Sequence, residues 1–300
     1  PMPLLRTLAA VSAGLAAAVA LTACGGSEPL ASGETEAIVI GSQDYYSNEI
    51  IAEIYAQALE AAGHEVVREF RIGQREVYVP EIESGAIDLF PEYTGPLLQY
   101  WEPDTEARLA DEVYTALQDA TPEGLRLLDQ SPATDQDSYT VTRAFAEQWG
   151  LETIADLAKV SDPLTLGGNS EGEARPNGPS GLEATYGVTV AFTPIEDGGG
   201  PLTVKALQDG DIQLAIIYTA DPSMQKNDLD SLEDTEGLFL ASHVVPVASD
   251  DIDDEAAAII NAISAAMSAD DLVGLNLRSV DEELAPAEIA ADWLAAENLN

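Results

Sequence analysis

Apolar and polar positions alternate along residues 37–128 in a pattern that predicts strands and helices in turn. A short apolar run at 37–40 ends at Gly41, and from Ser47 onward apolar residues recur at helical spacing up to Gly63. The same reasoning predicts strands at 64–72, 87–90 and 125–128 and helices at 76–84 and 105–120. Alternation of this kind predicts βαβ units and a parallel sheet.

A second set of similar elements follows Pro132. It comprises predicted strands at 139–142, 164–166, 189–192 and 212–218 and helices at 153–159, 182–186 and 203–208. The apolar run at 238–240 is expected to recross to the first set, and helices are expected at 255–267 and 286–297.

We therefore expect an α/β protein with two lobes, each built on one βα sheet, joined by two hinge crossings. The first lobe is expected to comprise residues 37–133 and 240–300, and the second lobe residues 134–239. The hinges are expected near 132–135 and 240–243, with a cleft between the lobes.

The amino-terminal segment has the pattern of an export signal. Residues 1–23 carry one basic side chain, Arg6, and then an apolar stretch, and Leu21-Thr22-Ala23-Cys24 matches a bacterial lipobox. A transmembrane helix is the alternative interpretation. We expect Cys24 to be lipidated and residues 24–36 to form a solvated tether. Cys24 is also the single cysteine, so no disulfide within the chain is expected.

Composition and charge narrow the range of partners. The 300 residues contain 54 Asp plus Glu and 12 Lys plus Arg, which gives a formal net charge of −42. Nucleic acids and anionic membrane surfaces would repel such a chain. With 46% hydrophobic residues, the sequence still has the apolar content of a folded protein, so the charge predicts an acidic surface rather than disorder.

The sequence offers little for catalysis. It contains no P-loop, no Gly-x-Ser-x-Gly element, and only His64 and His243, without the spacing of a zinc site. We expect no enzyme activity, no cofactor and no metal. An enzyme using two carboxylates remains an open alternative.

Tyrosines stand where open α/β sheets place ligand sites. Tyr93 and Tyr218 follow predicted strands, and Tyr139 begins one. Tyrosine faces that converge from two lobes would hold a cation, each contributing about 0.5–2 kcal/mol when water is excluded. The alternative for each is an ordinary core or rim tyrosine.

Several segments in order along the chain resemble the substrate-binding proteins of osmoprotectant ABC importers, which bind glycine betaine, choline, carnitine or proline betaine. The most specific is Pro91-Glu92-Tyr93-Thr94-Gly95. The others lie at 41–43, 53–63, 87–90, 137–139, 175–178, 181–182, 186–187, 207–210 and 212–218. The resemblance extends over roughly residues 37–300.

The resemblance implies a two-lobed, type II periplasmic-binding-protein fold that closes on a quaternary ammonium ligand in a tyrosine cage. Tyr93, Tyr139 and Tyr218 match cage tyrosines, and Asp137 matches a residue whose main-chain carbonyl faces the cation. Arg175 matches an arginine that holds a ligand carboxylate, for which a guanidinium fork is suited. The alternative for Arg175 is a surface ion pair.

Three positions depart from the family pattern. Gln43 stands where some relatives carry Lys, Pro96 replaces a carboxylate-binding Thr, and Ser242 stands where a fourth cage tyrosine is usual. Pro96 has no N–H to donate, so Gln43 or helix amino-terminal N–H groups would share the carboxylate with Arg175. Tyr45 or Tyr46 is the candidate for the missing aromatic face.

The resulting expectation is a lipid-anchored receptor on the extracytoplasmic face of the cell membrane. It captures a small quaternary ammonium or zwitterionic ligand and delivers it to an ABC permease driven by a separate ATPase. The same fold binding another small ligand, such as an amino acid, is the alternative, and a lipoprotein with an enzymatic or structural role is a second one.

Overall fold

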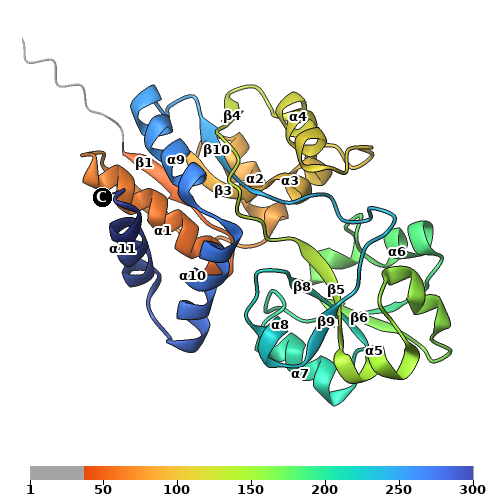
Figure 1. The fold of residues 1–300 in the computed structure, drawn as a ribbon. Coiled ribbons are helices and arrows are strands. Elements are labelled where there is room, and N and C mark those ends of the chain that lie inside the picture. The colour runs from red at the N-terminus through yellow and green to blue at the C-terminus, as the bar shows by residue number, and fades with distance from the viewer. Residues whose placement is uncertain (1–36, 300) are drawn as a thin grey trace, which may run out of the picture. The chain divides into compact units, whose positions relative to one another are not determined.

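Two five-stranded sheets form the framework of residues 37–299, the part of the chain that the computed structural model describes (Figure 1). The first sheet, in the order β2-β1-β3-β10-β4, contains β1 (Ile38–Gly41), β2 (Val66–Glu69), β3 (Leu89–Tyr93), β4 (Leu125–Leu127) and β10 (Val244–Ser249). The second sheet, in the order β7-β6-β8-β5-β9, contains β5 (Asp137–Thr142), β6 (Thr165–Gly168), β7 (Ala191–Pro194), β8 (Leu214–Tyr218) and β9 (Leu229–Ser231). The expected α/β class with two sheets is confirmed.

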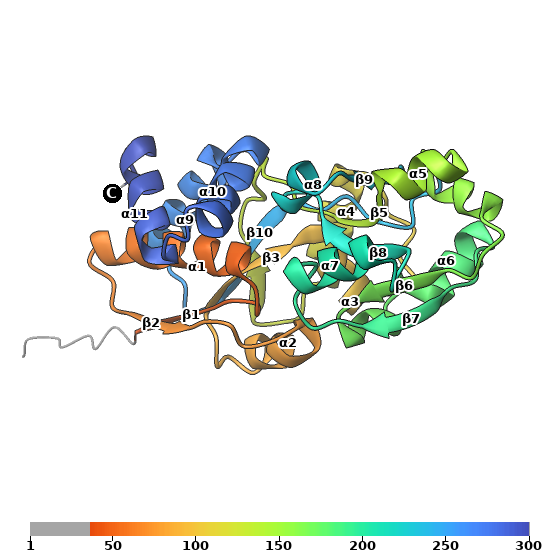
Figure 2. The ribbon, with the colours of Figure 1, turned by 90° about the horizontal axis from the view of Figure 1, so that it is seen from below.

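Helices cover both faces of the first sheet (Figure 2). On one face lie α1 (Tyr46–Ala61), α9 (Asp254–Ala266), α10 (Ala269–Asp281) and α11 (Pro286–Glu297). On the other face lie α2 (Arg75–Glu83), α3 (Thr94–Trp101) and α4 (Ala110–Ala120). The helical periodicity that predicted α1 corresponds to its buried face, where Ile50, Ile54 and Leu59 are inaccessible to solvent.

The second sheet is covered in the same way. Its helices are α5 (Arg143–Trp149), α6 (Pro179–Tyr186), α7 (Pro201–Asp209), α8 (Ser223–Lys226) and the 3-10 helices η1 (Ile154–Lys159) and η2 (Ser170–Glu173). One apolar cluster packs Leu182 of α6 and Ile154 of η1 against β5, and another packs Val204 of α7 against β8. Each sheet thus has its own core.

The chain passes between the sheets twice, after β4 and again before β10. The two crossing segments pair through an antiparallel bridge between Thr134 and His243. Ser242 Oγ also donates to the carbonyl oxygen of Asp135 at 2.8 Å. The expected lobe boundaries, after residues 133 and 239, fall in these segments and stay a prediction of the sequence.

The predicted parallel pairing holds for β1 with β2 and β3 and for β6 with β7 and β8, but both sheets also contain antiparallel strands. β10 runs antiparallel to β3 and β4, and β5 runs antiparallel to β8 and β9. The reason is that each of these strands starts at a crossing. Asp137 at the start of β5 pairs with Tyr218 at the end of β8, and Val244 at the start of β10 pairs with Tyr93 at the end of β3. At one edge of the second sheet, the carboxyl end of β8 therefore lies beside the amino end of β5. At one edge of the first sheet, the carboxyl end of β3 lies beside the amino end of β10.

The apolar run at 238–240, expected to recross to the first set, is buried without belonging to a strand: Leu238 and Phe239 pack in the core of the second sheet and Leu240 in that of the first. The strand that follows the crossing is β10. A short apolar run indicates burial but does not specify a strand. Pro246 obscured the true strand, since proline is disfavoured inside a sheet. It is tolerated because its carbonyl oxygen still accepts from the Leu128 N–H at 2.9 Å, and the Leu128 carbonyl oxygen, which an N–H at position 246 would face, accepts instead from the Tyr114 hydroxyl at 3.0 Å.

Helices α3, α5, α8 and α10 and strand β9 were not expected from the sequence. The start of α10 nevertheless carried a signal, because Ser268 Oγ accepts from the Asp271 N–H at 3.1 Å and the Asp271 carboxylate accepts from the Ser268 N–H at 2.8 Å. This reciprocal capping is readable as a Ser followed three residues later by an acid.

The expected signal at 1–23, the lipidation site Cys24 and the tether at 24–36 lie outside the described residues. Within residues 37–299, no single helix has both the length and the apolar character of a membrane span; α9 and α10 meet that test only together, with a bend of 91° between them.

Gly95 allows the crossing segment to pack closely on α3. A Cβ at this position would lie 2.8 Å from the carbonyl oxygen of Ala241 and 2.9 Å from that of Leu240, both of which are backbone atoms that cannot move aside independently. We expect Gly95→Ala to lower the free energy of unfolding by about 1–3 kcal/mol in urea titrations.

Gly274 provides the matched control for this prediction. It lies within α10, and a Cβ there would meet no atom within 4 Å. Gly274→Ala should therefore raise the free energy of unfolding by about 0.5–1 kcal/mol. Equal effects of the two substitutions would contradict the packing argument.

Candidate functional site

A small cavity lies where the facing edges of the two sheets meet. Residues of the first sheet and its helices, together with residues of the crossing segment and the second sheet, line it: Gln43, Tyr45, Arg75, Tyr93, Pro96, Asp135, Asp137, Arg175 and Tyr218. We call this the inner cavity. Of the six ligand residues predicted from the sequence, five line it: Gln43, Tyr93, Asp137, Arg175 and Tyr218.

Three tyrosines form the aromatic part of the inner cavity. The ring centroids of Tyr45 and Tyr218 are 5.3 Å apart, and the Tyr45 hydroxyl donates to the Tyr93 hydroxyl at 2.9 Å. Burial raises the pKa of all three phenols above the usual value, so they stay neutral and keep their π faces available. Of the two candidates for the missing aromatic face, Tyr45 lines the cavity, and Tyr46 packs edge-on against Tyr45 at 6.3 Å.

Tyr139 is the predicted aromatic residue that the structure places elsewhere. Its side chain is fully buried in the core of the second sheet, edge-on to Phe239 with centroids 4.9 Å apart. Its hydroxyl donates to the carbonyl oxygen of Asn177 at 2.7 Å, and Asn177 Nδ2 donates to the Asp137 carboxylate at 2.8 Å. Tyr139 therefore supports two residues at the cleft without lining the inner cavity.

A buried ion pair adjoins Tyr93. Arg75 Nε and Glu92 Oε1 are 2.7 Å apart, with Arg75 6% exposed and Glu92 fully buried. Glu92 also accepts from the Tyr78 hydroxyl at 2.5 Å and from the Tyr93 N–H at 2.6 Å. Burial disfavours the charged guanidinium, but the Glu92 carboxylate outweighs it, and the pKa of Arg75 is raised above its usual value.

The sequence reasoning missed Arg75, although a signal was present. Arg75, Tyr78, Val79 and Ile82 are all buried and follow the spacing of one helix face. A cation on an otherwise apolar helix face indicates a buried partner, because an unpaired buried charge is strongly unfavourable.

Two carboxylates of the crossing segment and β5 line the same cavity. Asp135 is 5% exposed and accepts from the Ala220 N–H at 2.8 Å. Burial raises its pKa to about 8. Asp137 is half-buried and held by Asn177. The sequence reasoning missed Asp135, because in a chain with so many acids its position carries no distinguishing pattern.

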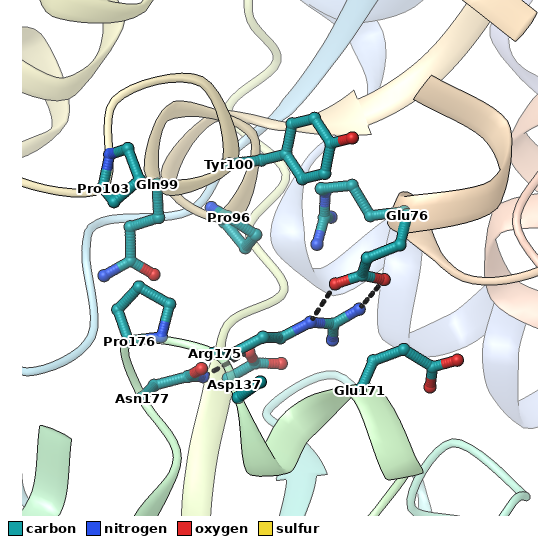
Figure 3. Close-up of a pocket in the computed structure, with 12 residues that line it drawn as sticks. Glu76, Pro96, Gln99, Tyr100, Pro103, Asp137, Glu171, Arg175, Pro176 and Asn177 are labelled. Carbon is teal, nitrogen blue, oxygen red and sulfur yellow. Dashed lines mark hydrogen bonds and ion pairs between the residues drawn. The ribbon is translucent and has the colours of Figure 1, made fainter. Parts of the chain in front are cut away.

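Arg175 lines both the inner cavity and a larger outer cavity of about 470 Å³, whose lining is drawn in Figure 3. Its Nε and one terminal nitrogen donate to the two Glu76 oxygens at 3.1 and 3.0 Å, and it also donates to Gln74 at 3.3 Å. Glu76 belongs to α2 of the first sheet, so this pair joins the two sheets. Burial lowers the pKa of Arg175, but the hydrogen bonds to Glu76 outweigh this and raise it. Arg175 is ion-paired, as the alternative interpretation held, but its side chain is only 19% exposed.

Hydrogen bonds hold Gln43 and Ser242 in place. The Gln43 N–H donates to Asn48 Oδ1 at 2.8 Å, which ties the loop after β1 to the start of α1. Ser242, where the resemblance predicted a fourth cage tyrosine, donates through its Oγ to the carbonyl oxygen of Asp135. It does not line the inner cavity.

The inner cavity is contracted in this arrangement. Its volume of about 20 Å³ accommodates roughly one water molecule. A trimethylammonium group is larger than this, so its entry requires the surrounding rings to move apart. Among residues 37–299, no group of three or more His, Cys, Asp or Glu side chains is arranged to hold a metal ion.

Relatives agree with this architecture. A glycine betaine-binding protein of Escherichia coli, YehZ, is 26% identical over 272 residues, covering 86% of this chain and 89% of the relative. A glycine-betaine-binding protein of Pseudomonas aeruginosa is 24% identical over 290 residues, covering 92% and 93%. A solved structure of a glycine betaine/carnitine/choline ABC transporter protein superposes with a TM-score of 0.70 at 21% identity, covering 87% of this chain and 99% of that one, and so shares its fold.

The expected type II binding-protein fold is thereby confirmed. Residues 36–296 match the family described as the substrate binding domain of ABC-type glycine betaine transport systems. Because this match spans far more than half of the chain, the protein belongs to that family of transport proteins, which bind solutes and are not enzymes.

Proposed function

We propose that this protein captures a quaternary ammonium solute of the glycine betaine and choline type between its two sheets and presents it to an ABC permease driven by a separate ATPase. The observation that carries the proposal is the meeting of Tyr45, Tyr93 and Tyr218 in one cavity that also contains carboxylates. Neutral phenol faces attract cations without forming hydrogen bonds, which a quaternary nitrogen cannot donate. The relatives' names, which specify glycine betaine, carnitine or choline, support the same ligand class.

The affinity must arise from the desolvated cavity. Each aromatic face contributes about 0.5 kcal/mol when exposed to water and about 2 kcal/mol when water is excluded. The three rings are therefore effective only once the sheets have closed around the ligand. Ligand binding would shift the equilibrium toward the closed arrangement, since only that arrangement contacts the ligand from both sides.

A ligand carboxylate, where one is present, would be held by Arg175 with help from Gln43. The guanidinium fork of Arg175 fits a carboxylate bidentately, and it already holds Glu76 in that way. A betaine must therefore compete with Glu76. Pro96 offers no N–H at the cavity wall. Tyr139 enters the proposal as support for Asn177 and Asp137 rather than as an aromatic wall.

The amino-terminal sequence completes the proposal. Cleavage before Cys24 and acylation of its thiol would hold the protein at the extracytoplasmic face of the membrane. The residues from 24 to 36 would then act as a tether between the lipid anchor and the folded part.

Replacing Tyr93 or Tyr218 with Leu should weaken binding of choline and glycine betaine about 3-fold to 30-fold each, since one aromatic face is lost. Isothermal titration calorimetry measures this directly. Tyr186→Leu is the matched control, because Tyr186 lies on α6 and bonds to Asp234 away from the cavity. Binding of an amino acid, with no binding of any quaternary ammonium compound, would overturn the proposal.

Substitutions of Arg175 or Glu76 should affect the binding of glycine betaine and the binding of choline differently. Arg175→Ala should weaken glycine betaine binding at least tenfold, because a charge-assisted pair contributes roughly 1.5–3 kcal/mol, and change choline binding less than about threefold. Glu76→Gln should strengthen betaine binding about 3-fold to 10-fold by freeing the guanidinium. Arg143→Ala, which breaks an exposed pair with Asp230, is the control. Equal losses for both ligands on Arg175→Ala would show that Arg175 acts in closure and not on a carboxylate.

Cys24→Ala should release the protein from the membrane. In a bacterial host supplied with labelled palmitate, the unaltered chain is expected to be labelled and to sediment with membranes, while the variant stays unlabelled. Membrane attachment of the unlabelled variant would indicate that the apolar segment at 4–23 itself acts as the anchor, contrary to the proposal.

A further inference from the structure

The Asp135 carboxylate is a buried acid that faces the inner cavity without a cationic partner. It is 5% exposed, and its one hydrogen bond in the described structure comes from the Ala220 N–H. None of the ion pairs among the described residues involves it. The ligand is the group best placed to neutralise it.

We propose that Asp135 determines specificity by supplying the counter-charge for a net cationic ligand, so that this site selects a quaternary ammonium alcohol such as choline over zwitterionic betaines. This rests on the proposed function, since it concerns which member of the ligand class binds best. It assigns to the carboxylate a role distinct from that of the aromatic faces.

The charges of the other residues around the cavity favour the same ligand. Arg75 is neutralised by Glu92, and Arg175 is neutralised by Glu76. Asp135 and Asp137 are then the two carboxyl groups of the lining that none of the described ion pairs involves. A choline cation can ionise and meet Asp135 without breaking any pair, whereas a betaine must displace Glu76 from Arg175 and also bring its own carboxylate toward two aspartates.

The surroundings of Asp135 make its ionisation dependent on the ligand. Burial raises its pKa to about 8, and the neighbouring negative charges of Asp137 and Asp221 act in the same direction. The ionisable groups that face it are Tyr45 and Tyr46 at the start of α1, Tyr93 at the end of β3, Asp137 and Tyr218 at the paired ends of β5 and β8, and Asp221 just beyond β8.

None of these neighbours supplies a compensating positive charge, and the two arginines of the same lining, Arg75 and Arg175, are each paired with a glutamate. The four tyrosines stay neutral, because burial raises the pKa of each above the usual value. Asp221 accepts a hydrogen bond from the Tyr46 hydroxyl at 2.9 Å. His243, on the neighbouring crossing segment, has its Nδ1 on the carbonyl oxygen of Ser131 at 2.9 Å. A cation in the inner cavity would therefore lower the pKa of Asp135 and release its proton.

Because choline binding would release a proton from Asp135, the affinity for choline depends on pH. Below a pH of about 8, the free protein holds a proton on Asp135 that the choline complex does not hold. Choline affinity should therefore rise with pH, at least tenfold between about pH 6 and pH 9. Glycine betaine, whose carboxylate offsets its ammonium charge, should change less than about threefold.

Calorimetry of the unaltered protein tests the proposal. Titrations at about pH 7 in buffers of different ionisation enthalpy should show that close to one proton is released for each choline bound. The uncharged isostere 3,3-dimethylbutanol, which has the shape of choline without its charge, should release none. These readouts report ionisation, so a merely structural role of Asp135 would not produce them.

Asp135→Asn is the corresponding variant, and its amide oxygen can still accept from the Ala220 N–H. It should lose the proton release, flatten the pH profile and weaken choline binding at least tenfold, with glycine betaine changed about threefold or less. Asp129→Asn, which removes an exposed carboxylate earlier on the same segment, is the control for overall charge. Should Asp135→Asn fail to fold, the measurements on the unaltered protein decide the matter.

The outcomes separate this inference from the proposed function. If choline and glycine betaine bind equally well, with no proton release and no pH dependence, Asp135 does not select the ligand, although the proposed function stands. If neither compound binds at any pH, the proposed function itself fails.

Discussion

The buried ion pair between Arg75 and Glu92 is the interaction on which the candidate site depends. Removing one partner of such a pair leaves an uncompensated buried charge, which destabilises a protein by about 3–5 kcal/mol. Here Glu92 is fully buried and accepts from Arg75, from the Tyr78 hydroxyl and from the Tyr93 N–H. These bonds attach α2 to the end of β3 and fix the backbone from which the Tyr93 ring projects. The position of the Tyr93 backbone therefore depends on this adjoining charge pair.

The same requirement for pairing governs the rest of the cleft. The chain has few cations, and the two that line the inner cavity are each held by a glutamate, Arg75 by Glu92 and Arg175 by Glu76. The first pair lies within one lobe's helices and sheet, where it is structural. The second joins elements of both sheets, so it breaks whenever they separate or a carboxylate competes for the guanidinium. The two Arg–Glu pairs are chemically alike, but only the pair of Arg175 with Glu76 connects the two sheets.

Much of this arrangement was readable from the sequence, and the failures have physical causes. The alternation of strand-like and helix-like hydrophobic spacing predicted both sets of strands and helices. The location of Tyr93 and Tyr218 directly after predicted strands predicted both residues at the cleft. Tyr139 lies on the same strand as Asp137 but two residues further on, about 6.6 Å along, which is enough to move a side chain from the sheet edge into the core. Asp135 was missed because what distinguishes it is the lack of a cationic partner, and Glu76 was missed because its partner, Arg175, belongs to the other sheet. That relation depends on how the two sheets meet, which no local pattern specifies.

The location of Asp135 connects ligand charge to the movement of the sheets. It lies on one crossing segment, and its carbonyl oxygen is bonded to Ser242 of the other, beside the bridge between Thr134 and His243. Its carboxylate, in turn, is held by the N–H of Ala220 just beyond β8. A ligand shifts a conformational equilibrium only by interacting differently with the two states. Because Asp135 is attached to both crossing segments, closer enclosure by the sheets disfavours its charged form. The cation that we propose to bind there would offset this cost only in the arrangement that places it against the carboxylate, and would therefore favour that arrangement.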